Sequence, residues 1–128
     1  MKLLIDQLAD MNVEHVRTVQ ELRKQHEIVY WIRIESVLPI DKSAFPGTVF
    51  HDYQDAIKGI APKEIDASAF EPWSKEQIVA LSQWESELLI MMDKAHALWS
   101  VSRRKDFYYD LLRYWGGVLD LFTPDLIV

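Results

Sequence analysis

The chain has 128 residues, of which 49% are hydrophobic and 27% are charged, a balance typical of one folded globular domain and not of a disordered segment. Its formal charge of −6 disfavours a nucleic-acid partner, because phosphate binding needs a basic surface, and the lack of cysteine excludes disulfides, thiolate metal sites and a cysteine nucleophile within these residues. No apolar run approaches the about 20 residues that a transmembrane helix needs, and Asp6 interrupts the apolar start, so we expect no transmembrane segment, no signal peptide and a cytoplasmic location.

The first third of the chain has the pattern of a strand, a helix and a second strand. Residues 2–6 form a short apolar run, a loop follows over residues 7–11, and Asn12 is placed to cap a helix with apolar residues on its inner side. Residues 27–35 are rich in β-branched and aromatic side chains, which are typical of a strand. This order and spacing predict a parallel pair of strands joined by a right-handed crossover.

The middle of the chain contains shorter elements. Proline and glycine mark residues 36–47 as a loop, residues 48–51 match a short third strand, and residues 53–60 match one or two helical turns. Residues 63–72 have an irregular pattern typical of an exposed segment.

The clearest helix begins at Ser74. Ser74-Lys75-Glu76-Gln77 fits a capping box, and an apolar stripe then continues to Trp99. We expect a helix of about 25 residues, kinked or packed against a partner domain, since it is longer than a typical crossover helix.

The end of the chain, residues 103–128, has the pattern of an amphipathic helix, a turn and an apolar strand. Thr123-Pro124 stops the helix, and residues 125–128 predict a strand, normally central in its sheet and covered on both faces. Gly116-Gly117 inside the helix costs about 1 kcal/mol per glycine relative to alanine, so we expect close packing against a strand or a neighbouring helix there. The chain ends where the next loop of an α/β unit is expected, which indicates an amino-terminal piece of a longer protein.

These elements predict an α/β protein: a Rossmann-like three-layer half-domain with a small, mostly parallel sheet of about three or four strands and long amphipathic helices. We expect residues 1–128 to form a single domain. The alternative is an all-helical protein in which residues 2–6 and 27–35 are helical.

Ligands in open α/β sheets bind beyond the carboxyl ends of the strands, so the loops after the strands are the first places to look for a site. His51 follows the predicted third strand with Asp52 beside it, and the pair is a candidate general base with a carboxylate partner. A structural or solvent-facing histidine is the alternative. The four histidines lack any metal-binding spacing, and the chain has no glycine-rich nucleotide-binding motif, so we expect neither a metal nor a cofactor.

Polar residues near the other strand ends are candidates for substrate binding. We single out Gln7, Asn12 and Glu35, and a phosphate can bind at the start of the helix that follows Asn12. Arg103, in a basic cluster over residues 103–105, is a candidate contact for an anion. The plainer alternatives are that Asn12 only caps its helix and that the basic cluster only solvates a loop. The tryptophans present a choice between a sugar-binding surface and the core, and their helical spacing favours the core.

The two ends of the chain, MKLLID and YYDLLRYWGGVLDLFTPDLIV, resemble the amino-terminal half of bacterial proteins of capsular and surface polysaccharide biosynthesis. The intervening stretches FHDYQDAIKG and LLIMMDKAHALW resemble the same group, which is similar to glycosyltransferases of the GT-B type. The resemblance implies an amino-terminal Rossmann-like domain that contributes mainly to acceptor binding, while a carboxy-terminal domain holds the donor nucleotide. It transfers no catalytic residue to this chain, and it implies little or no transferase activity for such a fragment alone.

The leading hypothesis is therefore the acceptor-side domain of a glycosyltransferase-like protein, with a sugar or nucleotide-sugar ligand. We expect its partner to be the missing carboxy-terminal domain or a second copy of the chain. The alternative is a non-catalytic α/β interaction or regulatory domain that works through its long helix.

Overall fold

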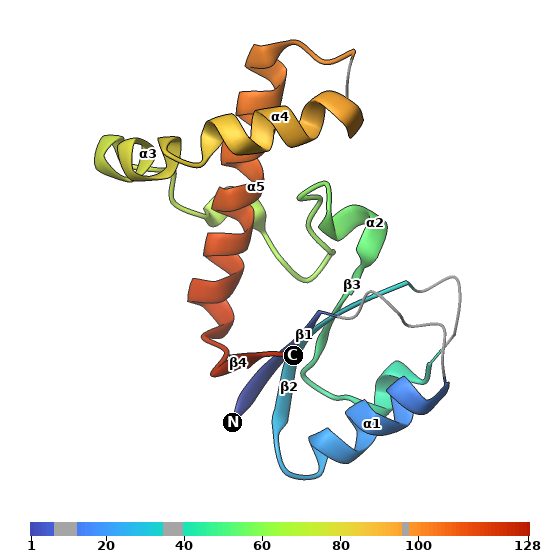
Figure 1. Ribbon diagram of the computed structural model, residues 1–128. Coiled ribbons are helices and arrows are strands. Elements are labelled where there is room, and N and C mark those ends of the chain that lie inside the picture. The colour runs from blue at the N-terminus through green and yellow to red at the C-terminus, as the bar shows by residue number, and fades with distance from the viewer. Residues whose placement is uncertain (7–12, 35–39, 96–97) are drawn as a thin grey trace.

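A four-stranded parallel sheet forms the middle of the protein, with helices on both of its faces (Figure 1). The computed structural model describes residues 1–6, 13–34, 40–95 and 98–128. The strands lie in the order β3-β2-β1-β4, and each neighbouring pair is parallel. The predicted α/β class and Rossmann-like half-domain are thus confirmed, and the all-helical alternative is wrong. The strands are β1 (Lys2–Asp6), β2 (Glu27–Arg33), β3 (Val49–Asp52) and β4 (Leu126–Ile127).

The helices follow the predicted order along the chain. α1 covers one face of the sheet, whereas α2 and the end of α5 cover the other (Figure 1). None of the helices in the described ranges combines the length and apolar character needed to span a membrane. The elements are α1 (Val13–Arg23), α2 (Tyr53–Ala56), α3 (Lys75–Ser82), α4 (Glu85–Ala95) and α5 (Val101–Phe122), with 3-10 turns η1 (Lys42–Ala44) and η2 (Ala67–Ala69).

The helix predicted over residues 74–99 is divided into α3 and α4, a sharper interruption than the kink expected for it. Its predicted start is confirmed: the Gln77 amide donates to the Ser74 hydroxyl, and the Ser74 amide donates to the Gln77 side chain. The break at Gln83-Trp84 changes the chain direction, so that α4 crosses α5 (Figure 1).

Contacts between α4 and α5 account for this break. Glu85, at the start of α4, lies 2.7 Å from Lys105 Nζ and accepts a hydrogen bond of 2.7 Å from the Tyr109 hydroxyl. These hydrogen bonds lower the pKa of Glu85, and the bond to Glu85 raises the pKa of Tyr109 to about 12. Farther along α4, Asp93 pairs with the buried guanidinium of Arg104. These contacts hold α4 against α5 after the break.

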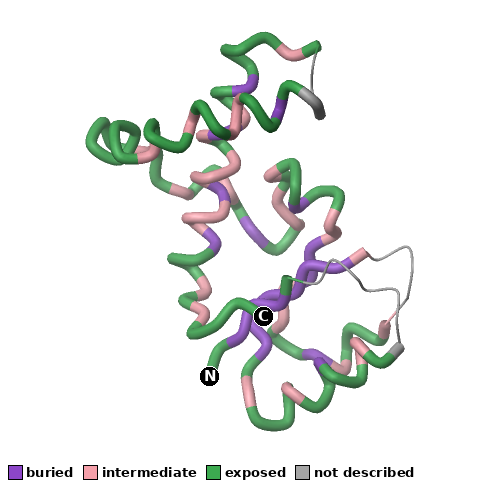
Figure 2. The backbone as a smooth tube through the Cα atoms, viewed as in Figure 1, coloured by how far each residue is buried: buried purple, intermediate pink, exposed green. Residues whose placement is uncertain are grey.

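The sheet separates two apolar clusters. Figure 2 shows the strands as the most buried part of the molecule, as expected for a parallel sheet covered on both faces. Toward α1 the buried side chains are Leu3, Ile5, Val19, Ile28, Trp31, Phe45 and Phe50. Toward α2 and α5 they are Leu4, Val29, Tyr30, Ile32, Ala56, Ile65, Tyr114 and Val118.

A register shift between β1 and β2 changes the face that Tyr30 occupies. Leu3 pairs with Ile28 but Leu4 pairs with Tyr30, so Val29 is an extra residue in β2. Val29 and Tyr30 both join the cluster that faces α5, whereas simple alternation would place Tyr30 on the same face as Ile28. The shift therefore brings the Tyr30 side chain to the face where β3 and α5 supply its partners.

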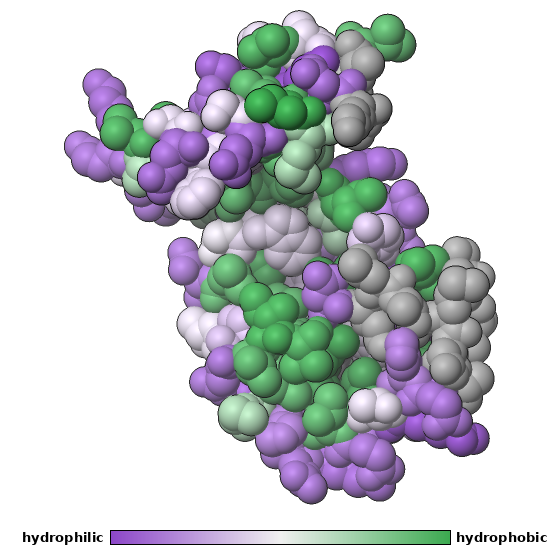
Figure 3. All heavy atoms as spheres, in the orientation of Figure 1, coloured by the Kyte–Doolittle hydropathy of each residue, from purple (hydrophilic) through white to green (hydrophobic). Residues whose placement is uncertain are grey.

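β4 is an edge strand, whereas the sequence predicted a central strand covered on both faces. α5 ends at Thr123, which has a left-handed conformation with φ of 43° and turns the chain back beside β1. Within the described residues β4 pairs only with β1, and Leu126, Ile127 and Val128 are 50%, 55% and 51% exposed. Figure 3 shows an apolar patch where β4 and the end of α5 lie. The expectation was wrong because apolar composition identifies a strand without specifying its neighbours in the sheet.

The two adjacent glycines of α5 allow the segment between η2 and α3 to pack directly on the helix. A Cβ added to Gly117 would lie 2.3–2.7 Å from atoms of the Phe70 ring, and one added to Gly116 would lie 3.3 Å from Trp73 Cη2. Arg113 holds the same segment, since its Nη2 donates a 2.9 Å hydrogen bond to the Phe70 carbonyl. The predicted close packing is confirmed, but the partner is a loop segment and not a strand or helix.

Candidate functional site

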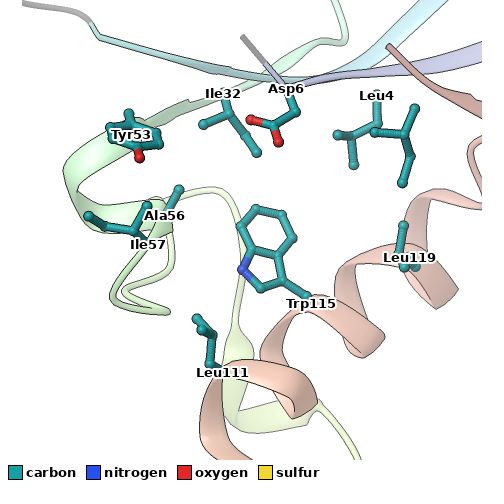
Figure 4. A pocket seen from close by; sticks show the side chains of 10 residues that line it. Leu4, Asp6, Ile32, Tyr53, Ala56, Ile57, Leu111, Trp115 and Leu119 are labelled. Carbon is teal, nitrogen blue, oxygen red and sulfur yellow. The ribbon is translucent and has the colours of Figure 1, made fainter. Parts of the chain in front are cut away.

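A cavity of about 490 Å³ opens at the carboxyl edge of the sheet, between the strands, α2 and α5 (Figure 4). It lies beside the carboxyl ends of β1 and β4, where the strand order reverses, and this is where open α/β sheets bind ligands. Its volume falls in the range of small-molecule sites. The lining residues are Leu4, Asp6, Ile32, Tyr53, Ala56, Ile57, Leu111, Trp115, Leu119 and Ile127.

Three residues bring polar groups to this otherwise apolar lining. Figure 4 shows the Asp6 carboxylate directed from the end of β1 toward the Trp115 indole. Within the described residues, the side chains of Asp6, Tyr53 and Trp115 form no hydrogen bond or ion pair. They leave an acceptor, a hydroxyl and a ring N–H available to a ligand. Apolar walls with a few polar groups are typical of a site that binds a small organic molecule.

Behind Trp115, a chain of buried hydrogen bonds joins α5, β2 and β3. The Tyr114 and Tyr30 hydroxyls are 2.8 Å apart, the Tyr30 hydroxyl is 2.7 Å from His51 Nδ1, and His51 Nε2 is 2.7 Å from the Ile60 carbonyl oxygen. Because a carbonyl oxygen only accepts, Nε2 carries the hydrogen, and in the neutral ring Nδ1 accepts from Tyr30. Tyr30 must then accept from Tyr114, so each bond in the chain has a defined direction.

The rings of this hydrogen-bonded chain also position Trp115. Its ring centroid lies 6.0 Å from that of Tyr30, 6.0 Å from that of His51 and 5.1 Å from that of Tyr114. The contacts with Tyr30 and Tyr114 are edge-to-face, and contacts of this kind stabilise aromatic clusters beyond the burial of their area. The buried cluster therefore holds the indole that forms one wall of the cavity.

Burial sets the protonation of the groups in this chain. It lowers the pKa of His51 from its ordinary value, while the hydrogen bond to Ile60 and the carboxylates of Asp55 and Asp52 act in the opposite direction. Burial also raises the pKa of Tyr30, to which the hydrogen bond with Tyr114 adds, and it raises the pKa of Tyr114. The histidine is thus held neutral and the tyrosines stay protonated near neutral pH.

The pKa of His51 predicts how stability depends on pH. Its folded-state pKa is lowered, so below the ordinary value of about 6.5 the unfolded chain binds a proton that native His51 does not. The stability that His51 contributes is therefore present above pH 6.5 or so and is lost as pH falls through that value. Urea denaturation between about pH 5 and 8 measures this loss, and a His51→Gln variant should show a shallower decline over the same range. Equal slopes for the two proteins would contradict the assignment.

The structure places His51 and Asp52 at the carboxyl edge of the sheet, but both have structural contacts. His51 is 1% exposed, and both of its ring nitrogens are hydrogen-bonded. Asp52 caps α2 by accepting a 2.9 Å hydrogen bond from the Gln54 amide. Neither residue is among those that line the cavity. The role of this pair as a general base remains a prediction.

Of the other predicted contacts, the structure describes only Arg103. Gln7, Asn12 and Glu35 lie outside the described residues. Arg103 is in the first turn of α5, where its guanidinium lies 4.1 Å from the centroid of the Trp99 ring. It precedes Trp115 by twelve residues, or roughly 18 Å along the helix. Its role as an anion contact remains a prediction.

The sequence contains a signal for two cavity residues that the prediction did not use. Asp6 is the last residue of the first strand, the position at which α/β proteins place functional side chains. Tyr53 follows the third strand in the same way. Trp115 could not be recognised, because helical spacing assigns it to the core, and it packs against the core and lines the cavity at once.

Comparison of the chain with known protein families, curated proteins and solved structures finds no match. Along the described ranges, no group of three or more His, Asp or Glu side chains is arranged to hold a metal ion.

Proposed function

We propose that this chain is the acceptor-side domain of a glycosyltransferase-like protein of capsular or cell-surface polysaccharide biosynthesis, and that it binds the acceptor in the cavity at the carboxyl edge of the sheet. The observation that carries the proposal is the cavity itself. It combines the Trp115 indole with the Asp6 carboxylate, which forms no hydrogen bond or ion pair within the described residues, at the position where Rossmann-like folds bind their ligands.

The chemistry of the lining supports a sugar without phosphate groups better than a nucleotide. The apolar face of a sugar ring can pack on the indole of Trp115, while Asp6 accepts hydrogen bonds from its hydroxyls. The described lining contains no lysine, arginine or histidine. A nucleotide diphosphate needs such groups or a helix N-terminus, so the donor nucleotide would belong to another domain of the full protein.

A non-catalytic interaction domain is the second candidate, favoured by the apolar surface beside the cavity. Leu119 is 38% exposed and Ile127 is 55% exposed, and both line the cavity, in the region where Figure 3 shows an apolar patch over the end of α5 and β4. Contiguous exposed apolar side chains of this kind often mark a protein contact. A cavity that binds no small molecule in the isolated chain would favour this second candidate.

Nuclear magnetic resonance titration with phenyl β-D-glucoside and with uridine diphosphate glucose tests the first candidate. We expect the glycoside to shift the backbone amide signals of Asp6 and Tyr53 and the ring N–H signal of Trp115. The dissociation constant should be about 1 mM or tighter. The nucleotide sugar should leave these signals unchanged, because the described lining has no cation for its phosphates. Absence of any glycoside-dependent shift across a panel of phenyl glycosides would reject acceptor binding at this site.

A further inference from the structure

The described lining of the cavity carries one charged side chain, the carboxylate of Asp6. Among the described residues, no ion pair joins Asp6 to Arg33, the cation at the end of β2. The Arg33 guanidinium lies over the ring of Trp31, 5.5 Å from its centroid, and Trp31 belongs to the cluster on the α1 face of the sheet. Trp115 lies at the α5 face, and Asp6, at the end of β1, lines the cavity there and also borders a hollow on the α1 face. The described lining of the cavity therefore carries a net negative charge.

Two aromatic side chains line the cavity together with this carboxylate. Trp115 and Tyr53 both line the cavity, and Figure 4 shows the Asp6 carboxylate directed toward the indole. The face of an indole attracts a cation, and a carboxylate beside it can accept a charge-assisted hydrogen bond from the same cation. The remaining walls, which include Leu4, Ile32 and Leu119, suit an apolar body.

We propose that the cavity recognises a primary ammonium group carried on an apolar ring or short chain, with Asp6 and Trp115 as the groups that bind the ammonium. The inference deepens the proposed function, because it makes the acceptor an amine-bearing molecule, such as an amino sugar. It rests on the proposed function only in assuming that the acceptor and the amine bind in the same cavity. Anionic molecules of the same size are excluded, since the carboxylate repels them and the described lining has no cation to pair with them.

Three probes of nearly equal shape separate charge from size: 2-phenylethylamine, 2-phenylethanol and phenylacetate. Titration of the whole chain at pH 7, followed by nuclear magnetic resonance, measures each dissociation constant. We expect the amine to bind about tenfold more tightly than the alcohol, from one charge-assisted hydrogen bond and one cation–π contact, and phenylacetate to bind more weakly than the alcohol.

An Asp6→Asn variant tests the carboxylate directly. It should remove most of the tenfold or so preference for the amine while leaving the affinity for 2-phenylethanol within about twofold, which also shows that the cavity is intact. Asp106→Asn is a matched control, because Asp106 is an exposed carboxylate of the first turns of α5 and does not line the cavity. It should keep the preference of the unmodified chain.

The inference is overturned if phenylacetate binds as tightly as the amine, if none of the probes binds, or if Asp6→Asn leaves the ratio of amine to alcohol affinity unchanged. Binding of phenyl glycosides without a preference for the amine would reject this inference and leave the proposed function standing. Binding of the amine without binding of any glycoside would reject the proposed function and leave this inference standing.

Discussion

Replacement of Tyr30 with phenylalanine is expected to lower the free energy of unfolding by about 2–4 kcal/mol, although it removes only one oxygen atom. The Tyr30 hydroxyl is the middle member of the buried chain, accepting from Tyr114 and donating to His51. Without it, the Tyr114 hydroxyl and His51 Nδ1 are both left unpaired in residues that are 4% and 1% exposed. Each stranded buried group costs about 1–3 kcal/mol. Urea denaturation at pH 7.5 measures the change, read from the midpoint at constant slope.

Tyr114→Phe is the matched control for this prediction. It removes the hydroxyl at the start of the chain, and the Tyr30 hydroxyl can still donate to His51. The expected loss is about 0.5–1.5 kcal/mol, the net value of one hydrogen bond. Equal losses for the two variants would show that the direction assigned to these hydrogen bonds is wrong.

Substitution of Gly117 with alanine is expected to destabilise the protein by about 1–2 kcal/mol, even though alanine favours a helix. The added Cβ would lie 2.3 Å from Cγ of Phe70 and close to both of its Cδ atoms, so the whole ring would have to move. The main chain of Phe70 cannot move away freely, because Arg113 is hydrogen-bonded to its carbonyl oxygen, so the ring must leave its position by rotating about the side-chain bonds. Thermal or urea denaturation measures the loss.

The neighbouring glycine provides an opposite expectation in the same helix. At Gly116 the added Cβ would lie 3.3 Å from Cη2 of Trp73, an atom at the far end of the indole that can move by a few tenths of an ångström. The gain in helix propensity, about 1 kcal/mol, then offsets the contact, and Gly116→Ala should be neutral or stabilising. Equal destabilisation by both substitutions would indicate that helix flexibility, and not the packing of Phe70, requires the glycines.

The sequence was sufficient to predict where the candidate site lies, but not which of the described side chains form it. The rule that α/β folds bind ligands at the carboxyl ends of strands points to the edge where the cavity lies. It does not identify which side chains face the cavity. His51 has a reactive side chain in such a position, yet it is buried by contacts with Tyr30 and Ile60. Trp115 has an ordinary core position in the helical pattern, yet it lines the cavity.

The sequence by itself determined the elements whose signals are local. The capping box at Ser74, the helix stop at Thr123-Pro124 and the β-rich composition of residues 27–33 each act within a few residues. Local signals of this kind need no distant contact, because capping, backbone restriction and side-chain periodicity depend only on neighbours along the chain. They were sufficient to predict an α/β fold with the correct order of strands and helices along the chain.

Only the tertiary structure decided how these elements meet. The extra residue Val29 in β2 turns Tyr30 toward α5. The break at Gln83-Trp84 follows from contacts with α5. In the described chain β4 pairs with β1 alone and therefore lies at the edge of the sheet. The cavity likewise unites Asp6 with Trp115 from opposite ends of the sequence. These features depend on packing between residues far apart in the chain, and no periodicity or cap along one segment specifies such a partner.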